Sequence, residues 1–392
     1  MNPLDFYQQK IDDLKGKNLL RSLNHSESQS GLFFKQQNTS FLNFASNQYL
    51  NLNEHPRLIE AGQKALSLWG AGSGGSRLLG GSLQIHQEFE EYWANRTQTE
   101  ASLLFNQGYT ANIGMLSALG LASKEVTFFI DQLAHASMIE GVLQSGAKWQ
   151  RFRHNDMLHL ESLLMVHREK NLGPAWIVSE SLFSMDGDFA PLSEIVDLAN
   201  KYNTFTYIDE AHSDGIYGPL GHGCVAALEK NQHVDVVVST FGKAFGCHGA
   251  IVATSALFKQ LFVNTAKPLI YSTALPPVQV ALMKEASLIA EEENFRATHL
   301  IQLSSWLRTE FKANGMNILN SESQIIPLVF GENELTLKNF ESLKKLGYWC
   351  PAVRTPTVPP HTARLRMNIT AAMTQEILEP FLTDVIQNCK IE

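Results

Sequence analysis

The chain has 392 residues, of which 44% are hydrophobic and 18% charged, and its formal net charge is −8. This length exceeds the size at which one hydrophobic core usually stops growing, so we expect a large domain and a smaller one. The composition is that of a globular enzyme, and the negative charge argues against nucleic-acid partners, whose phosphates need a surface rich in Lys and Arg.

The N-terminal segment MNPLDFYQQKIDDLKGKN is polar and lacks the apolar core of a signal peptide. No later apolar run approaches the length of a membrane span. We therefore expect a cytoplasmic protein without a membrane partner. Residues 1–45 are expected to form an N-terminal arm that includes a short strand.

Short β-rich runs alternate with segments of helical period in the next part of the chain, which we predict to be a large domain at 46–280. The runs are ASLLF (101–105), VTFFID (126–131), WIVSES (176–181), TFTYIDEAH (204–212), VDVVVST (234–240) and GAIVAT (249–254). Apolar residues recur at helical spacing in 112–121, 157–168 and 192–201. The alternation predicts an α/β fold with a mostly parallel central sheet covered on both faces, and ligands at the carboxyl ends of its strands.

The pattern changes near residue 276 to long helical stretches. Three β-rich runs follow, QIIPLVF (324–330), GYWCPAVR (347–354) and RLRMNIT (364–370). We predict a smaller α+β domain at 281–392. The four cysteines are far apart and form no CxxC pair, so neither a zinc site nor a dithiol redox site is indicated, and no metal site is predicted.

Asp209 and Lys243 each follow a predicted strand and can face one cleft at the same edge of the sheet. A lysine can form an imine with an aldehyde once it is partly desolvated, and a carboxylate can hold a pyridine nitrogen protonated. This pair predicts pyridoxal 5′-phosphate (PLP) as a Schiff base on Lys243. For an isolated Lys and Asp, a solvated loop lysine and a helix cap would be the more common situation. The small residues around Lys243, among them Gly242 and Gly246, favour a flat ligand.

A phosphate site is predicted where NQGYTANIG follows the strand at 101–105. Gly108 and Tyr109 open a helix there, and Thr240 can add a hydroxyl. An ordinary strand-to-helix turn is the alternative for Gly108. The glycine-rich segment at 69–82 has no GK[ST] ending and follows a helical pattern, so it is not a P-loop.

Four further polar residues are candidates for the same site. His135 could lie on the ring of the cofactor, or be a buried or capping histidine; His212 could reach the ring hydroxyl or the substrate, or be a loop histidine. Ser184 could donate to the same ring oxygen. Arg366 lies on an apolar strand, where a substrate carboxylate or an internal Asp or Glu must be its partner.

These residues occur in motifs that together resemble the α-oxoamine synthase family of PLP enzymes, which have the aspartate-aminotransferase-like fold type I. The motifs are FASNQYLNL, GSGGSRLLGGS, NQGYTANIG, HASMIEG, FSMDGDFAPL, IDEAHSDGIYGPLGHG, STFGKAFGCHGA and LIYSTALPP. The resemblance implies decarboxylative condensation of an amino acid with an acyl thioester. VRTPTVPPHTARLRMNITAA and LIYSTALPP most resemble the members that join L-alanine to a pimeloyl thioester, carried by coenzyme A or a carrier protein, and give 8-amino-7-oxononanoate in biotin synthesis.

The resemblance also implies roles for individual residues. It makes Lys243 the Schiff-base lysine and acid/base, with Asp209 on the pyridinium nitrogen and His135 stacked on the ring. It places Ser184 and His212 near the ring hydroxyl, Gly108, Tyr109 and Thr240 at the phosphate, and Asn47 and Arg366 on the substrate carboxylate. Arg21, Arg354 and Thr357 are further expected to bind substrate. The family's enzymes are homodimers with a shared active site, so Ser272 and Thr273 are expected to be contributed by the partner chain.

Three segments depart from the family's pattern: HSDG replaces HGTG, GHG at 221–223 replaces GRG, and NQYLNL replaces NDYLGL. We expect them to concern the acyl-chain side or surface loops. Other functions stay open: a synthase that uses glycine and acetyl-CoA, one that makes a long-chain amino-ketone signal, an aminotransferase, or a PLP-binding regulatory protein.

Overall fold

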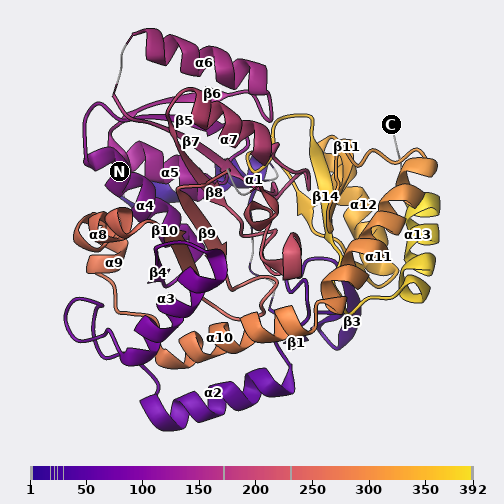
Figure 1. Ribbon diagram of the computed structural model, residues 1–392. Helices are drawn as coiled ribbons and strands as arrows, with labels where there is room; N and C mark the ends of the chain where they lie inside the picture. The colour runs from indigo at the N-terminus through magenta and orange to yellow at the C-terminus, as the bar shows by residue number, and fades with distance from the viewer. Residues whose placement is uncertain are drawn as a thin grey trace.

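The computed structural model describes residues 3–17, 19–21, 23, 25–29, 31–170, 173–229 and 232–389. Residues 1 and 392, which bound the predicted arm and the predicted small domain, lie outside them. In Figure 1 a sheet covered by helices occupies one side of the molecule, and the C-terminal part from about residue 295 on, in light orange and yellow, forms a smaller body beside it. The division at 46–280 and 281–392 stays a prediction.

The central sheet has seven strands in the order β4-β10-β9-β8-β7-β5-β6. All neighbouring pairs are parallel except those of β10, which is antiparallel to β4 and β9. The prediction of a mostly parallel sheet is confirmed. The strands are β4 Ala101–Phe105, β5 Thr127–Asp131, β6 Lys148–Phe152, β7 Ala175–Glu180, β8 Phe205–Asp209, β9 Val236–Thr240 and β10 Ala250–Thr254.

Alternate residues of these strands enter two different hydrophobic cores, one on each face of the sheet. Phe128 and Ile130 of β5 pack with α4, α5, α8 and α9, whereas Phe129 between them packs with α3, α6, α7 and α10. Strands buried on both faces are apolar throughout, which explains why the sequence identified them. β6 was not predicted, because three of its five residues are exposed at the edge of the sheet and its sequence, KWQRF, is mostly polar.

The helices agree with the three predicted segments and extend one of them toward the N-terminus. Helix α4 begins at Gly108, as the phosphate-site prediction required. The helices are α1 Leu4–Gly16, α2 Pro56–Trp69, α3 Gln84–Thr97, α4 Gly108–Leu121, α5 Ala136–Ser145, α6 Met157–Glu169, α7 Leu192–Lys201, α8 Ala256–Thr265, α9 Lys267–Ile270, α10 Pro277–Glu292, α11 Phe295–Ala313, α12 Asn333–Lys345 and α13 Gln375–Asn388, with short 3₁₀ turns η1 Pro219–Gly221 and η2 Val225–Ala227. Within the described ranges, no helix combines the length and apolarity that crossing a membrane requires.

Two small sheets complete the fold. One has the order β11-β14-β13 and is antiparallel, with β11 Ile325–Gly331, β13 Ala352–Val353 and β14 Ala363–Asn368. The other joins β1 Ser28–Gln29, β2 Phe33–Gln36 and β3 Thr39–Asn43 to β12 Tyr348–Trp349, which runs parallel to β3. The predicted run GYWCPAVR is therefore divided between two sheets, and Pro351, which cannot donate to a ladder, lies between its halves.

Candidate active site

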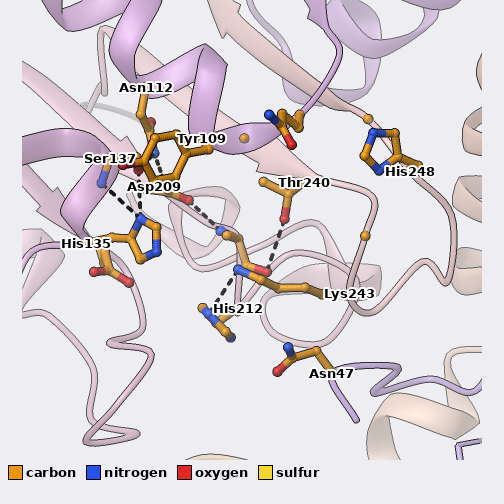
Figure 2. A pocket seen from close by; sticks show the side chains of 16 residues that line it. Asn47, Tyr109, Asn112, His135, Ser137, Asp209, His212, Thr240, Lys243 and His248 are labelled. Carbon is orange, nitrogen blue, oxygen red and sulfur yellow. Dashed lines mark hydrogen bonds between the residues drawn. The ribbon is translucent and has the colours of Figure 1, made fainter. Parts of the chain in front are cut away.

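A cavity of about 310 Å³ lies at the carboxyl ends of the central strands, where ligands of such sheets are expected. It brings together most of the predicted cofactor residues from six separate segments of the chain (Figure 2). The predicted residues that line it are Asn47, Gly108, Tyr109, His135, Asp209, His212, Thr240 and Lys243.

Lys243 is held at the centre of this cavity by a chain of hydrogen bonds. Its Nζ lies 2.9 Å from Nε2 of His212, and Nδ1 of His212 lies 2.8 Å from the hydroxyl of Tyr49. The Tyr49 hydroxyl donates to Oδ1 of Asn47 at 3.1 Å, so it accepts from Nδ1–H of His212. Nε2 of His212 is therefore left as an acceptor for a Lys243 N–H.

Burial is the main cause of the pKa shifts of Lys243 and His212. It lowers the pKa of Lys243 to about 8, although the charge of Asp209 opposes it. Burial, and next the charge of Lys243, lower the pKa of His212 well below its usual value. The lysine can thus lose its proton near neutral pH, as imine formation and proton abstraction require.

Asp209 ends β8 and points into the cavity with both carboxylate oxygens hydrogen-bonded. Oδ1 accepts from the backbone N–H of Ala211 at 2.8 Å, and Oδ2 accepts from the side-chain amide of Asn112 at 2.7 Å. The hydroxyl of Tyr207 donates to Oδ1 of Asn112 and so orients that amide. Asp209 therefore caps a turn, and not the helix that the alternative interpretation required, and it also presents a fixed carboxylate to the cavity.

His135 caps α5 and faces the same cavity. Its Nδ1 accepts from the backbone N–H of Ser137 at 3.3 Å and lies 2.7 Å from the Ser137 hydroxyl. That hydroxyl accepts from Asn112, so its own proton points to Nδ1, and the ring proton of a neutral His135 is on Nε2. Burial lowers the pKa of His135, against the charge of Asp209, which favours the neutral, flat-stacking form.

The predicted phosphate corner has the required geometry. Gly108 is the first residue of the 14-residue helix α4, and Gln107 before it provides no side-chain cap for the free N–H groups. A Cβ at Gly108 would lie 2.5 Å from Cγ2 of Thr240, so only glycine fits against that side chain. A helix start with uncapped N–H groups is a suitable anion site. With the buried lysine and the fixed carboxylate, these residues fit PLP.

Arg366 is buried at the edge of this site without an internal carboxylate partner. Its Nε donates to the backbone carbonyl of Ser184 at 2.6 Å, and its Nη1 to Oδ1 of Asn47 at 3.4 Å. Among the described residues, no Asp or Glu forms an ion pair with it. The alternative of an internal salt bridge is therefore wrong, and the guanidinium keeps donors for a planar carboxylate.

A second cavity, of about 680 Å³, adjoins the first at His135. Arg21, Ser184 and Thr357 line it, and Arg21 donates to the hydroxyl of Thr357 at 3.0 Å. Burial, and next the charge of Arg21, lower the pKa of Arg354, which places these two cations near each other. Arg21 and Thr357 thus lie beside a second cavity, with Arg354 near Arg21, whereas the predicted substrate residue Asn47 lines the first cavity with Lys243.

Ser272 and Thr273 are not brought to the cavity around Lys243. They line a separate small cavity together with Arg77. The backbone carbonyl of Thr273 accepts from Asn106, two residues before Gly108. Their predicted contribution to a partner's site stays a prediction.

Several site residues were missed by the sequence analysis: Tyr49, Asn112, Ser137 and Glu180. Glu180 ends β7 beside Asp209, so its position at a strand end was a usable signal. Asn112 lies one helical turn after Gly108, but nothing in the sequence shows that this turn faces Asp209.

The turn that carries Ser184 is held by a partly buried histidine, His154, with two acidic partners. Nδ1 of His154 lies 2.9 Å from Asp131, and Nε2 lies 2.8 Å from Asp188. Burial disfavours the charge of His154, but the hydrogen bonds to both carboxylates outweigh it and raise its pKa to about 10. The imidazolium therefore joins the end of β5 to the loop after β7.

Replacing His154 by Leu is expected to reduce the free energy of unfolding by about 3 kcal/mol, because two buried carboxylates lose their cation. Since the folded-state pKa is above the usual 6.5, the wild-type contribution is full below pH 6.5 and is lost as pH rises through about 10. Urea unfolding at several pH values measures this, and the difference between the two proteins should shrink toward pH 10.

His167→Leu is the matched control, because His167 is buried and bonds to the backbone carbonyl of Gly173, with no carboxylate partner in the part of the chain that the structure describes. Burial lowers its pKa, so its effect on unfolding should not change between pH 7 and pH 10. An equal loss of stability from His154→Leu at both ends of this range would contradict a charged His154.

Two of the departures from the family's pattern meet in one buried ion network. Asp214, from HSDG, lies 3.4 Å from Arg96, and each side chain is only 3% exposed. Arg96 also donates to Glu291 at 2.8 Å, and His222, from GHG, lies 3.0 Å from the same carboxylate. Neither departure lines the two cavities. Asp214 therefore does not lie in an exposed surface loop, and its expected place on the acyl-chain side stays a prediction.

Known proteins with similar sequences and structures point to the same cofactor and fold. The sequence profile of the family described as aminotransferase class I and II matches residues 39–385. Curated relatives are provisionally named 8-amino-7-oxononanoate synthase. The one from Glaesserella parasuis is 40% identical over 382 residues, which cover 96% of this chain and 98% of the relative. The one from Geobacillus kaustophilus is 41% identical over 375 residues, which cover 94% of each.

Solved structures of two enzymes have the same architecture. Serine palmitoyltransferase from S. paucimobilis, with PLP and myriocin bound, superposes with a TM-score of 0.90 and 27% identity over 98% of this chain and 97% of that one. The structure of 8-amino-7-oxononanoate synthase from Francisella tularensis gives a TM-score of 0.76 and 25% identity over 88% of this chain and 97% of that one. The same architecture thus holds PLP in a protein of related sequence.

Proposed function

Because the chain belongs to the class I and II aminotransferase family, and within it to the PLP-dependent α-oxoamine synthases, we propose that it condenses L-alanine with a pimeloyl thioester. The products would be 8-amino-7-oxononanoate, the free thiol and carbon dioxide, in biotin synthesis. The observation that carries the proposal is the buried guanidinium of Arg366, which forms no ion pair with an Asp or Glu of the described ranges and donates to the Ser184 carbonyl. It offers one carboxylate site beside Lys243, as an amino-acid substrate requires.

Each residue around Lys243 has a proposed task. The aldehyde of PLP would bind to Nζ, its ring nitrogen would stay protonated against Asp209, and its phosphate would lie at Gly108 and Thr240. His135 would stack on the ring. PLP supplies the sink for the electron pair left when a bond to the substrate α-carbon breaks.

The chain's own groups would then move the substrate proton. Arg366 and Asn47 hold the carboxylate of the amino acid, so that the α-C–H bond is oriented toward Lys243. The amino acid would displace Nζ from the aldehyde, and the freed neutral amine of Lys243 would then accept the α-proton and later return it to the product carbon. Nε2 of His212, an acceptor 2.9 Å from Nζ, fixes the direction of the lysine lone pair.

The second cavity is the proposed site of the acyl thioester. Leu133, Ile139 and Val358 give it apolar walls that suit a methylene chain, and Arg21 and Arg151 also line it. Its carboxyl side chain, Asp186, is paired with Arg364, so the remaining charge in the cavity is positive. Such a cavity suits an acyl chain that ends in a carboxylate, such as the pimeloyl group, better than it suits an acetyl group. Coenzyme A and a carrier protein are both possible carriers.

A homodimer in the cytoplasm is also proposed. The segments around Ser76 and Thr273 are joined by a β-bridge, and the large apolar side chains beside them are exposed: Leu79 by 85% and Tyr271 by 80%. Exposed apolar side chains gathered on two adjoining segments favour an interface between copies. This supports the expectation that Ser272 and Thr273 complete the partner's site.

The test follows thiol and carbon dioxide released by the PLP-loaded protein with pairs of amino acids and thioesters. With L-alanine and pimeloyl-CoA we expect equal amounts of thiol, carbon dioxide and amino ketone. Glycine or L-serine should give a kcat/KM at least about tenfold lower, which corresponds to about 1.4 kcal/mol of discrimination.

A higher rate with another pair would transfer the assignment to a sister synthase. The similarity to serine palmitoyltransferase makes L-serine with a long-chain acyl-CoA the second pair to test. Keto acid formed without thiol would instead identify an aminotransferase.

A further inference from the structure

Glu180 is a buried carboxyl group of the cofactor cavity for which the proposed mechanism gives no task. It is the last residue of β7 and the register partner of Asp209 on the parallel strand β8. Its side chain lines the cavity, and the residue is only 3% exposed. Directly paired residues of neighbouring strands lie about 4.8 Å apart and point to the same face. Two carboxyl groups therefore share one buried space.

The hydrogen-bond donors around this pair are distributed unequally. Asp209 accepts from the Ala211 backbone N–H and from the Asn112 amide, one donor on each oxygen. Oε1 of Glu180 is buried and has no partner among the described residues. Donors stabilise a carboxylate anion, and a buried anion without them is costly. If one of the two carboxyl groups is protonated, it should therefore be Glu180 and not Asp209.

The charges that face Glu180 from the surrounding elements support this assignment. They are Asp209 on β8, Asp131 on β5 and Lys243 after β9, and the backbone N–H of His135 before α5 donates to Glu180. Burial, and next the charge of Asp209, raise the pKa of Glu180 well above its usual value, against the opposing effects of Lys243 and of the His135 backbone N–H.

We propose that Glu180 is a neutral carboxylic acid in the working enzyme, which leaves Asp209 as the only anion of the pair and lets Lys243 lose its proton near neutral pH. A charged Glu180 would be a second anion near Nζ and would hold the ammonium form. The proposal rests on the proposed use of Lys243 as the group that binds the aldehyde. It assigns Glu180 the task of keeping that amine reactive, and its O–H becomes a hydrogen-bond donor inside the cavity.

Glu180→Gln tests the proposal, because glutamine has the shape of a protonated glutamic acid and cannot ionise. The apoprotein is mixed with PLP at a series of pH values, and the midpoint of the aldehyde-binding rate reports the ionisation of Lys243. We expect the same midpoint in Glu180→Gln and wild type. If Glu180 is charged, the substitution removes an anion and the midpoint falls by about one pH unit or more, which would overturn the proposal.

Unfolding of the apoprotein gives a second readout that needs neither cofactor nor substrate. The folded-state pKa of Glu180 is raised above its usual 4.5, so the stability from its bound proton is full below pH 4.5 and is lost as pH rises through the raised value. Glu180→Gln cannot lose it. The melting temperature of Glu180→Gln should therefore equal that of wild type near pH 5 and exceed it near pH 8. Glu60→Gln is the control, because Glu60 is exposed, and its melting temperature should equal that of wild type at both pH values. A lower melting temperature for Glu180→Gln near pH 8 would overturn the proposal.

If Glu180→Gln does not fold, infrared spectroscopy of a folded variant that keeps Glu180 can show whether Glu180 is protonated. Glu210 is also buried, and burial raises its pKa to about 8, so Glu210→Gln removes the other neutral carboxyl group of this region. The carbonyl band of a protonated carboxyl at pH 8 in that variant supports the proposal, and its absence overturns it. A failure of alanine and pimeloyl-CoA to react would refute the proposed function alone, because none of these readouts involves either substrate.

Discussion

Lys243→Ala is expected to reduce turnover by about 10⁴-fold or more and to abolish the absorbance of PLP bound to the protein. Both effects have one cause, since the amine that would bind the aldehyde is also the base that accepts the substrate α-proton. Burial lowers the pKa of this amine to about 8, and no other lysine lines the cavity in the described part of the chain. Absorbance scans and single-turnover release of thiol measure the two effects separately.

Lys312→Ala is the control, because Lys312 is exposed near the end of α11 and should leave both signals unchanged. Borohydride reduction followed by peptide mapping should place the label on residue 243 in wild type. Label on another lysine, or a Lys243→Ala protein that still turns over at more than about a hundredth of the wild-type rate, would contradict the assignment.

The second large effect concerns stability. Arg96→Met is expected to reduce the free energy of unfolding by about 3–5 kcal/mol, because it leaves Asp214 buried without its cation. Arg96 and Asp214 are each 3% exposed, and the guanidinium also lies 4.4 Å from the ring centre of Trp93. A loss of this size is a large part of the stability of an ordinary domain. Chemical denaturation at neutral pH measures it.

Two controls define the cause of that loss. Lys338→Met breaks an exposed pair with Glu334, whose side chains are 68% and 78% exposed, and should have no measurable effect. The double variant Arg96→Met with Asp214→Leu should recover part of the stability, because no unpaired charge remains buried. If the double variant loses the sum of the effects of Arg96→Met and Asp214→Leu measured singly, the two residues are not energetically coupled, and the loss in Arg96→Met does not come from an unpaired Asp214.

Much of the active site could be predicted because its residues follow apolar strands. In a parallel sheet, residues just after the strands meet at one edge, so Asp209 and Lys243 could be placed in one cavity from their positions in the sequence alone. The same reasoning placed Gly108 at a helix start. It missed Asn112 and Tyr49, because their partners Asp209 and His212 come from distant segments and no local pattern shows which face of a helix or loop they meet.

The limits on the fold prediction have a similar origin. Strand β6 is polar because it lies at the edge of the sheet, where only one neighbour and one face need apolar contacts. The pairing of β3 with β12 joins residues about 300 positions apart, and such contacts leave no local periodicity.

The sequence by itself determined the alternation of strands and helices, the residues at the strand ends and hence the kind of chemistry at Lys243, because these depend on periodicity and residue type. Only the tertiary structure decided protonation and charge. Burial and the donors that lie within about 3 Å make His212 neutral and His154 charged. They also leave Arg366 without an acidic partner among the described residues, and they favour the proposed neutral Glu180 beside the anionic Asp209. Those distances are set by segments far apart in the chain, so no motif contains them.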